Sequence, residues 1–212
     1  MKHSVAVAKI PETASVTLPI AQITGLILAG GRGTRMGTVD KGLQSFRGAP
    51  MVQTVLQRLA PQVGPLMINA NQNLARYREC GVPAWPDEFE GFAGPLAGLH
   101  AGLSHCATPY LVCVPCDSPF LPVDLVQKLA AALVASGADL AMAVTGTDAT
   151  RQMHPVFCLM KTTLLPQLTH YLQTGGRKVE AWYRSGKLTE VLFEDESAFA
   201  NINTEADLRR LE

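Results

Sequence analysis

Short apolar segments alternate with amphipathic segments along the first two thirds of this chain of 212 residues. The apolar segments carry few polar side chains, which is typical of strands that are buried on both faces of a sheet. The segments between them place apolar residues at helical spacing. This alternation predicts an α/β fold of three layers, a mainly parallel twisted sheet with helices on both faces.

The individual elements follow from these periodicities and from the positions of proline and glycine. We expect strands over residues 23–28, 66–69, 82–85, 110–114, 139–144, 156–159 and 188–193. We expect helices over residues 50–63, 74–80, 96–106, 122–136, 162–173 and 179–185, and a terminal helix after Thr204. Pro50 and Pro122 fit first helical turns, and Gly81 and Gly137 fit positions just after helix ends. Strict alternation is lost in the last third, where mixed strand directions are expected.

The composition excludes several classes of protein. Eighteen basic and 18 acidic residues give no net charge, which argues against a general binder of nucleic acid or membrane surfaces. Hydrophobic residues make up 47% of the chain, so a sizeable core is expected. No segment reaches the roughly 18 consecutive apolar residues of a membrane span. The five cysteines are irregularly spaced and no export signal is recognisable, so we expect reduced thiols in a cytoplasmic protein.

The chain length fits one domain with a small appendage. Residues 1–22 lack clear periodicity, and we expect a flexible N-terminal extension there. The regular pattern begins at Ile23, so residues 23–212 are expected to form a single domain.

A glycine-rich loop that carries cations follows the first predicted strand. It reads LAGGRGTRMG over residues 28–37, and DKG follows over 40–42. Glycines let the backbone approach a phosphate, and Arg32, Arg35 and Lys41 could offset the charge of a triphosphate. No Gly-Lys-Ser/Thr closes the loop, and Met36 stands where a dinucleotide fingerprint has its third glycine. An ordinary turn would need no cations, so we favour a phosphate-binding loop.

Polar residues follow three of the other predicted strands. Ligands of open α/β sheets bind at the carboxyl ends of the strands, which directs attention to Asn69, Asp87 and Asp117. Asn69 suits either a base contact or a turn, and Asp87 taken alone reads as a loop acid. Asp117 lies just past a buried strand, and Mg²⁺ prefers one or two carboxylates together with phosphate oxygens. The sequence therefore predicts a magnesium ligand at Asp117.

Several later residues allow two interpretations. His154 is a lone histidine, for which we favour a hydrogen-bonded structural role. Arg177 and Lys178 follow a Gly-Gly pair and fit either solvated cations at a helix end or an anion patch for an acceptor phosphate. Asn203 or Thr204 could cap the terminal helix, since Asp207 stands at capping-box spacing from Thr204.

The glycine loop with DKG, together with GPLAG over residues 94–98 and PCDSP over 115–119, resembles the molybdenum cofactor guanylyltransferases, the MobA family. The resemblance covers residues 23–212. It implies a Rossmann-like nucleotidyltransferase fold and transfer of GMP from GTP to the terminal phosphate of the molybdenum–molybdopterin cofactor, with release of pyrophosphate. It also implies Mg²⁺ as cofactor and handover of the product to molybdoenzymes or their chaperones.

The resemblance also assigns roles to residues of this chain. The nucleotide contacts that it implies are Leu28, Ala29, Gly30, Gly31, Lys41, Asn69, Asp87 and Asp117. The catalytic groups are Arg35, Lys41 and Asp117, and the metal ligand is Asp117 with Asn203 close by. His154 lies toward the side of the cofactor acceptor, where Arg177 and Lys178 are further candidates.

Three alternative functions remain open from the sequence. A cytidylyltransferase acting on the same cofactor, or a sugar-phosphate nucleotidyltransferase, would keep the same loop. The Gly30–Gly31 pair with Pro-Cys-Asp favours the guanylyl enzymes, because relatives more often carry alanine in the glycine pair. A non-catalytic nucleotide-binding regulator would need no metal-binding acid, so Asp117 counts against that function.

Overall fold

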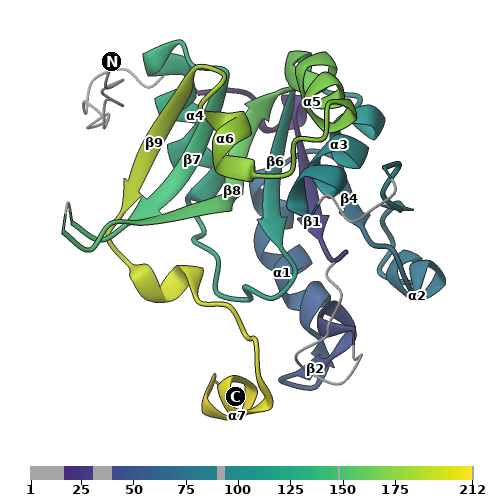
Figure 1. Ribbon diagram of the computed structural model, residues 1–212. Helices are drawn as coiled ribbons and strands as arrows, with labels where there is room; N and C mark the ends of the chain where they lie inside the picture. Colours follow the sequence, from purple (N-terminus) through teal and green to yellow (C-terminus); the bar gives the residue numbers. More distant parts are fainter. Residues whose placement is uncertain (1–16, 31–39, 90–93, 148, 212) are drawn as a thin grey trace.

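The computed structural model describes residues 17–30, 40–89, 94–147 and 149–211, and they are built around a seven-stranded sheet (Figure 1). The strands lie in the order β5-β4-β1-β6-β8-β7-β9. β8 runs antiparallel to both of its neighbours, and the other neighbouring pairs are parallel. The predicted mainly parallel sheet with a mixed C-terminal part is confirmed. The bounds are β1 Ile23–Leu28, β4 Leu66–Asn69, β5 Ala84–Trp85, β6 Tyr110–Pro115, β7 Leu140–Thr145, β8 Gln152–Lys161 and β9 Leu188–Phe193.

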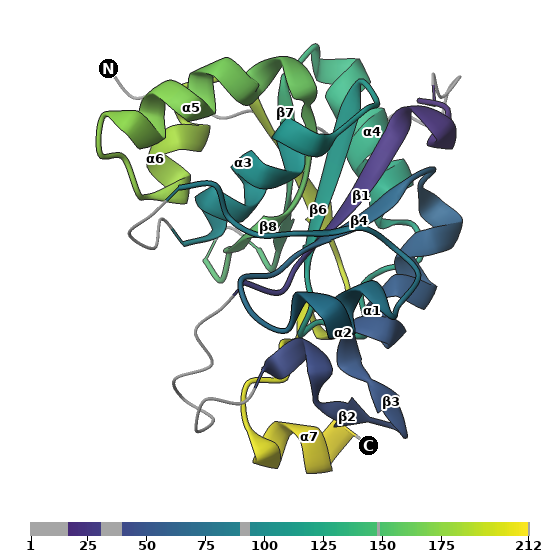
Figure 2. The ribbon, with the colours of Figure 1, turned by 90° about the vertical axis from the view of Figure 1, so that its right-hand side faces the viewer.

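Helices cover both faces of the sheet, as Figure 2 shows. Helices α1 (Met51–Leu59) and α4 (Leu125–Ser136) pack with α2 (Leu74–Arg78) into one hydrophobic cluster. Helices α3 (Pro95–His105), α5 (Leu165–Gln173) and α6 (Val179–Tyr183) pack into a second cluster on the other face. α7 (Glu205–Leu211) lies away from the seven-stranded sheet, beside the short strands β2 (Ser45–Phe46) and β3 (Ala49–Pro50) (Figure 2).

Three helices begin later than the sequence predicts. α5 begins at Leu165 instead of residue 162, because the preceding turn, Thr162–Leu164, is a 3₁₀ helix. α1 begins at Met51 with Pro50 as its N-cap, and α4 begins at Leu125 instead of Pro122. The reason for the later start of α4 is a long-range contact. The Gln62 side chain donates to the carbonyl of Pro122 at 3.0 Å and accepts from the backbone N–H of Val126 at 3.1 Å, so it caps the first turn of α4.

A short hairpin, β2 (Ser45–Phe46) with β3 (Ala49–Pro50), was not predicted. Its two turn residues, Arg47 and Gly48, have φ of 51° and 83°, and positive φ at both positions matches the twist of a hairpin. Strands of two residues give no periodicity that a sequence could show. The hairpin matters because Phe46 packs with Ile202 in a third small cluster, which fixes the segment that enters α7.

Part of the predicted N-terminal extension lies outside the described residues, namely 1–16. Residues 17–22 contain a 3₁₀ turn, Ile20–Gln22, and Leu18 packs against the first cluster. The extension and its boundary at residue 22 remain predictions. All five cysteines are free, and no helix of the described ranges is long and apolar enough to span a bilayer.

Candidate active site

The predicted polar residues gather at the carboxyl edge of the parallel strands. β1 lies between β4 and β6, and Leu28 at its end pairs with Asn69 on one side and Pro115 on the other. The N–H of Ala29 donates to the carbonyl of Asn69 at 2.7 Å, and the N–H of Cys116 donates to the carbonyl of Leu28 at 3.0 Å. The start of the glycine loop is thereby held between the two strand ends that carry the candidate site residues.

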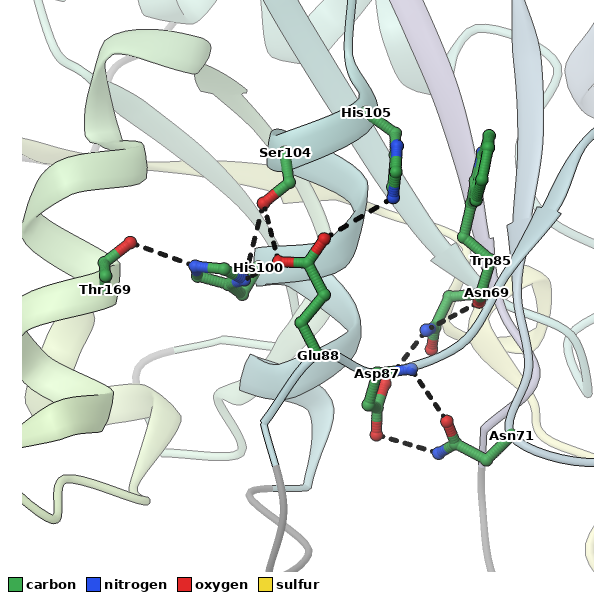
Figure 3. Close-up of polar contacts among 9 residues, drawn as sticks. All are labelled: Asn69, Asn71, Trp85, Asp87, Glu88, His100, Ser104, His105 and Thr169. Atoms are coloured by element: carbon green, nitrogen blue, oxygen red, sulfur yellow. Dashed lines mark hydrogen bonds and ion pairs between the residues drawn. The ribbon is translucent and has the colours of Figure 1, made fainter.

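A cluster of amides and a carboxylate lies on the β4–β5 side of this edge (Figure 3). The Asn69 side chain donates to one carboxylate oxygen of Asp87 at 2.9 Å, and the Asn71 side chain donates to the other at 2.8 Å. The N–H of Asp87 donates back to the Asn71 side-chain oxygen at 2.8 Å. Each carboxylate oxygen retains a lone pair, so the cluster can accept hydrogen bonds from a base. The sequence reasoning did not single out Asn71.

Two glycines make room for Asn69, which is 2% exposed. A Cβ at Gly98 of α3 would lie 2.4 Å from the Asn69 side-chain oxygen, and one at Gly30 would lie 3.1 Å from it. The first separation is far below normal contact, so position 98 needs glycine if Asn69 is to keep its place, whereas a Cβ at position 30 would require only a small shift of the Asn69 side chain. The GPLAG segment therefore has a packing function at the site.

A cation lies between two oxygens on the β6 side of the edge. The ammonium of Lys41 is 3.4 Å from the Asp117 carboxylate and donates to the Asn203 side-chain oxygen at 2.5 Å. The Asp117 side chain is 14% exposed, and its burial raises the pKa of the carboxyl group while the charge of Lys41 opposes this. The N–H of Ile202 donates to the Asp117 carbonyl at 2.8 Å and holds the C-terminal segment in place.

The oxygens of Asp117 and Asn203 fit a magnesium ion. One carboxylate and one amide oxygen already converge on a positive charge, and Mg²⁺ takes one or two carboxylates and completes its shell with water and phosphate oxygens. No group of three or more histidine, cysteine or acidic side chains suited to a metal occurs among the described residues. A shared site of protein and nucleotide oxygens is consistent with both observations.

Lys41 is itself positioned from α2. The preceding residue, Asp40, accepts hydrogen bonds from the Tyr77 hydroxyl and, at 3.1 Å, from the Asn73 side chain. Burial raises the pKa of the Tyr77 phenol, which keeps it a hydrogen-bond donor. A Cβ at Gly42 would lie 2.5 Å from the Tyr77 hydroxyl, which accounts for the glycine of the DKG motif. Sequence reasoning missed Tyr77, since nothing in its own surroundings distinguishes it from a core residue.

The structure separates the two interpretations of the segment before α7. Thr204 and Asp207 cap each other, with the N–H of Asp207 donating to the Thr204 hydroxyl at 3.0 Å and that of Thr204 to Asp207 at 3.1 Å. This leaves the Asn203 side chain free to face Lys41. The predicted capping box is confirmed, and Asn203 is not the residue whose side chain caps the helix.

The three acceptor-side candidates lie elsewhere in the fold. His154 of β8 makes a 2.9 Å hydrogen bond with Thr145 and stacks on Phe199, and burial lowers its pKa. The Arg177 guanidinium donates to the carbonyls of Leu172 and Gly176 at the end of α5, and Lys178 is exposed. Within the described ranges no hydrogen bond or ion pair joins these three to Lys41 or Asp117. Their acceptor roles remain predictions.

Three predicted loop residues, Gly31, Arg32 and Arg35, lie outside the described residues. The described end of the loop, Gly30, faces Asn69 and Asn71. The loop therefore leaves β1 at the amide cluster and re-enters the described structure at Asp40, beside Lys41.

Comparison with known proteins agrees with this geometry. The family model described as a MobA-like NTP transferase domain matches residues 25–189. The molybdenum cofactor guanylyltransferase of Cupriavidus necator is 61% identical over 188 residues, covering 88% of this chain and 94% of that protein. The enzyme of the same name from Bordetella petrii is 57% identical over 189 residues, covering 89% and 96%.

Solved structures share the fold at low sequence identity. Molybdopterin-guanine dinucleotide biosynthesis protein A from Archaeoglobus fulgidus has a TM-score of 0.71 at 22% identity and covers 89% of this chain and 96% of its own. A 4-diphosphocytidyl-2C-methyl-D-erythritol synthase from Anaerococcus prevotii has a TM-score of 0.73 at 12% identity, covering 91% and 97%. The fold thus serves proteins named for different bases, whereas the close sequence relatives share one name. The chain belongs to the MobA-like NTP transferases, within the molybdenum cofactor guanylyltransferase family, and is a nucleotidyltransferase.

Proposed function

We propose that the protein transfers GMP from GTP to the terminal phosphate of the molybdenum–molybdopterin cofactor. The observation that carries this proposal is the placement of two unlike clusters at one sheet edge. Lys41, Asp117 and Asn203 suit a metal and phosphates, and Asn69 with Asp87 suits a base. The β1 strand end lies between them, at the carboxyl edge where ligands of open α/β sheets bind.

The reaction needs charge neutralisation more than proton transfer. An oxygen of the acceptor phosphate bonds to the α-phosphorus of GTP, and the bond from that phosphorus to pyrophosphate breaks. Because the acceptor oxygen is already anionic, no general base is required, and catalysis consists of positioning and electrostatic stabilisation. Lys41 supplies one positive charge beside the phosphates. Mg²⁺ held by Asp117, with Asn203 as a second oxygen ligand, would supply charge neutralisation at the same phosphates.

The base assignment rests on the amide cluster and on the family. Guanine presents N–H donors on its Watson–Crick edge, and the Asp87 carboxylate has lone pairs to accept them. Cytosine also presents an amino donor, so this chemistry alone does not select guanine. The names of the close relatives favour GTP.

Calorimetric titration with Mg·GTP and, separately, Mg·CTP tests the base assignment. We expect GTP to bind at least about tenfold more tightly, which corresponds to roughly 1.4 kcal/mol. Preference for CTP would keep the nucleotidyltransferase assignment and overturn the choice of base. Failure to bind either nucleotide with Mg²⁺ would contradict the proposed site. Turnover is then measured with the molybdenum cofactor as acceptor, following pyrophosphate.

Alanine substitutions at two helical glycines of α3 separate the function of the site from the stability of the fold. A Cβ at Gly98 would meet the Asn69 oxygen at 2.4 Å and a Leu28 methyl at 2.6 Å, so Gly98→Ala should raise the KM for GTP about tenfold or more. A Cβ at Gly102 would meet a Leu26 methyl at 2.4 Å, within the core. Gly102→Ala should instead lower the Tm and leave the KM near that of the wild type. Equal effects of both variants on KM would contradict the packing of Gly98 against Asn69.

The partners and location that we propose follow from the same reaction. The product is a bulky dinucleotide cofactor, which is handed over to molybdoenzymes or to their chaperones. We further propose a cytoplasmic protein. Support comes from the five free cysteines, of which Cys113, Cys116 and Cys158 are buried.

A further inference from the structure

A second set of polar side chains lies directly behind Asp87. The carboxylate of Glu88 is 3.2 Å from Nδ1 of His100 and 3.5 Å from Nε2 of His105, and the Ser104 hydroxyl donates to it at 3.2 Å. All three partners belong to α3, and Glu88 belongs to the segment that leaves β5. The mechanism described above uses none of these four residues. We call them the Glu88 clamp.

Asp87 and Glu88 are consecutive, yet their side chains contact different elements. Figure 3 shows the Asp87 carboxylate between Asn69 and Asn71, and the Glu88 carboxylate at α3. The peptide that joins them is therefore fixed from both sides. The N–H of Asp87, which belongs to the preceding peptide, donates to the Asn71 side chain at 2.8 Å, so movement of Glu88 away from α3 would pull on the residue that makes this hydrogen bond.

Two aromatic contacts hold the same segment. The Trp85 ring stacks on His105 with 3.8 Å between centroids and 8° between planes, and the Phe89 ring meets His100 edge-on at 4.7 Å. The histidines that contact Glu88 thus also hold the residues on both sides of it. The segment is attached to one helix by a carboxylate and two rings.

The clamp continues into a second helix. Nε2 of His100 is 2.9 Å from the hydroxyl of Thr169 in α5. Burial lowers the pKa of His100, and the carboxylate of Glu88 acts in the opposite direction. The Thr169 hydroxyl also donates to the carbonyl of Leu165 at 2.9 Å, so its oxygen is held in place by α5. The orientation of His100 is therefore fixed by α5 as well as by Glu88.

We propose that Glu88 is a positioning residue of the nucleotide site. Side chains of α3 bind the Glu88 carboxylate, and Glu88 thereby holds Asp87 against Asn69 and Asn71. This inference rests on the proposed function, in which Asp87 contacts the base. Glu88 is 42% exposed, and a pair at that exposure adds little to global stability. Its effect is on the local order of the segment, and hence on nucleotide affinity.

Glu88→Ala tests the proposal in two measurements. In the protein without nucleotide, amide hydrogen exchange at Asp87 should be at least about tenfold faster, because the segment is released from α3. In the assay, the KM for GTP should rise about tenfold with kcat within twofold, since Lys41 and Asp117 belong to other elements. Glu88→Gln, which can still accept from Ser104, should give an intermediate KM.

Asp124→Ala is the matched control. Asp124 is also 42% exposed and pairs with Lys128 at 2.8 Å on α4, far along the chain from the clamp. It should leave both the exchange of the Asp87 amide and the KM unchanged. His105→Phe provides a second variant, because it keeps a ring to stack on Trp85 and removes the nitrogen that faces Glu88. We expect it to raise the KM by a smaller factor than Glu88→Ala.

The proposal is overturned if Glu88→Ala leaves the exchange of the Asp87 amide and the KM at the wild-type values, or if kcat falls with KM unchanged. The titration of the wild-type protein with GTP and CTP, made alongside, tests the proposed function separately from the effect of Glu88. Loss of GTP preference there would contradict the base assignment, while the amide exchange would still decide whether Glu88 holds Asp87.

Discussion

Replacing Asp117 by alanine is expected to lower kcat by at least about 10³-fold, on the order of 4 kcal/mol of transition-state stabilisation. Asp117 supplies the buried carboxylate beside Lys41, and in the proposed mechanism this carboxylate would hold the Mg²⁺ that neutralises the phosphates. The fold should survive. A carboxyl group whose pKa is raised by burial destabilises the folded state once it is ionised, so removing it should not lower the Tm at neutral pH. The measurements are Mg²⁺- and GTP-dependent turnover and thermal unfolding.

The control for this substitution lies at the opposite edge of the sheet. Asp139 precedes β7 and pairs with Lys161 at 2.8 Å, away from every candidate site residue. Asp139→Ala should leave turnover near the wild-type rate. Full activity of the Asp117→Ala variant would remove Asp117 from the mechanism.

Lys41→Met should lower kcat by about 10²- to 10³-fold, which is the typical loss when one preorganised charge-stabilising donor is removed. Methionine keeps much of the length of the side chain but removes the ammonium that lies between Asp117 and Asn203. It also leaves the Asp117 carboxylate without its charge partner, so higher Mg²⁺ should restore part of the rate. Turnover measured over a range of Mg²⁺ concentrations checks both effects.

Lys161→Met is the matched control, because it also replaces a lysine that pairs with an aspartate by methionine. Lys161 is 33% exposed and Lys41 is 24% exposed, and each pairs with one aspartate. We expect Lys161→Met to retain turnover. A loss of activity in the Lys41 variant that is no greater than in the Lys161 variant would show that Lys41 acts through stability alone.

The sequence predicted the layered fold because each buried strand carries its own signal. β9 has the predicted bounds, and β1 and β4 do as well. The positions of Asn69, Asp87 and Asp117 at one edge also follow from the sequence, since parallel strands end on the same side of a sheet. Local chemistry was sufficient for these features.

Features that depend on residues distant in the sequence could not be predicted. The start of α4 is set by Gln62, and the position of Lys41 depends on Tyr77 through Asp40. The contacts between Glu88 and α3 join two segments that are distant in the sequence. Taken alone, the first segment shows only an acidic residue in a loop, and the second shows only a helix of small residues. None of these contacts produces a periodicity or a motif in the sequence, because the two partners of each contact lie in segments with different local patterns.

The hydrogen bond from Ile202 to the carbonyl of Asp117, with Asn203 facing Lys41, has a consequence for biosynthesis. During translation the segments that carry Asn69, Asp87 and Asp117 leave the ribosome before residues 202–203 do. The Asn203 side-chain oxygen that faces Lys41 therefore arrives later than the other residues of the proposed site. A nascent chain can build most of this edge of the sheet before it can complete it, and activity should appear only after residues 202–203 have left the ribosome.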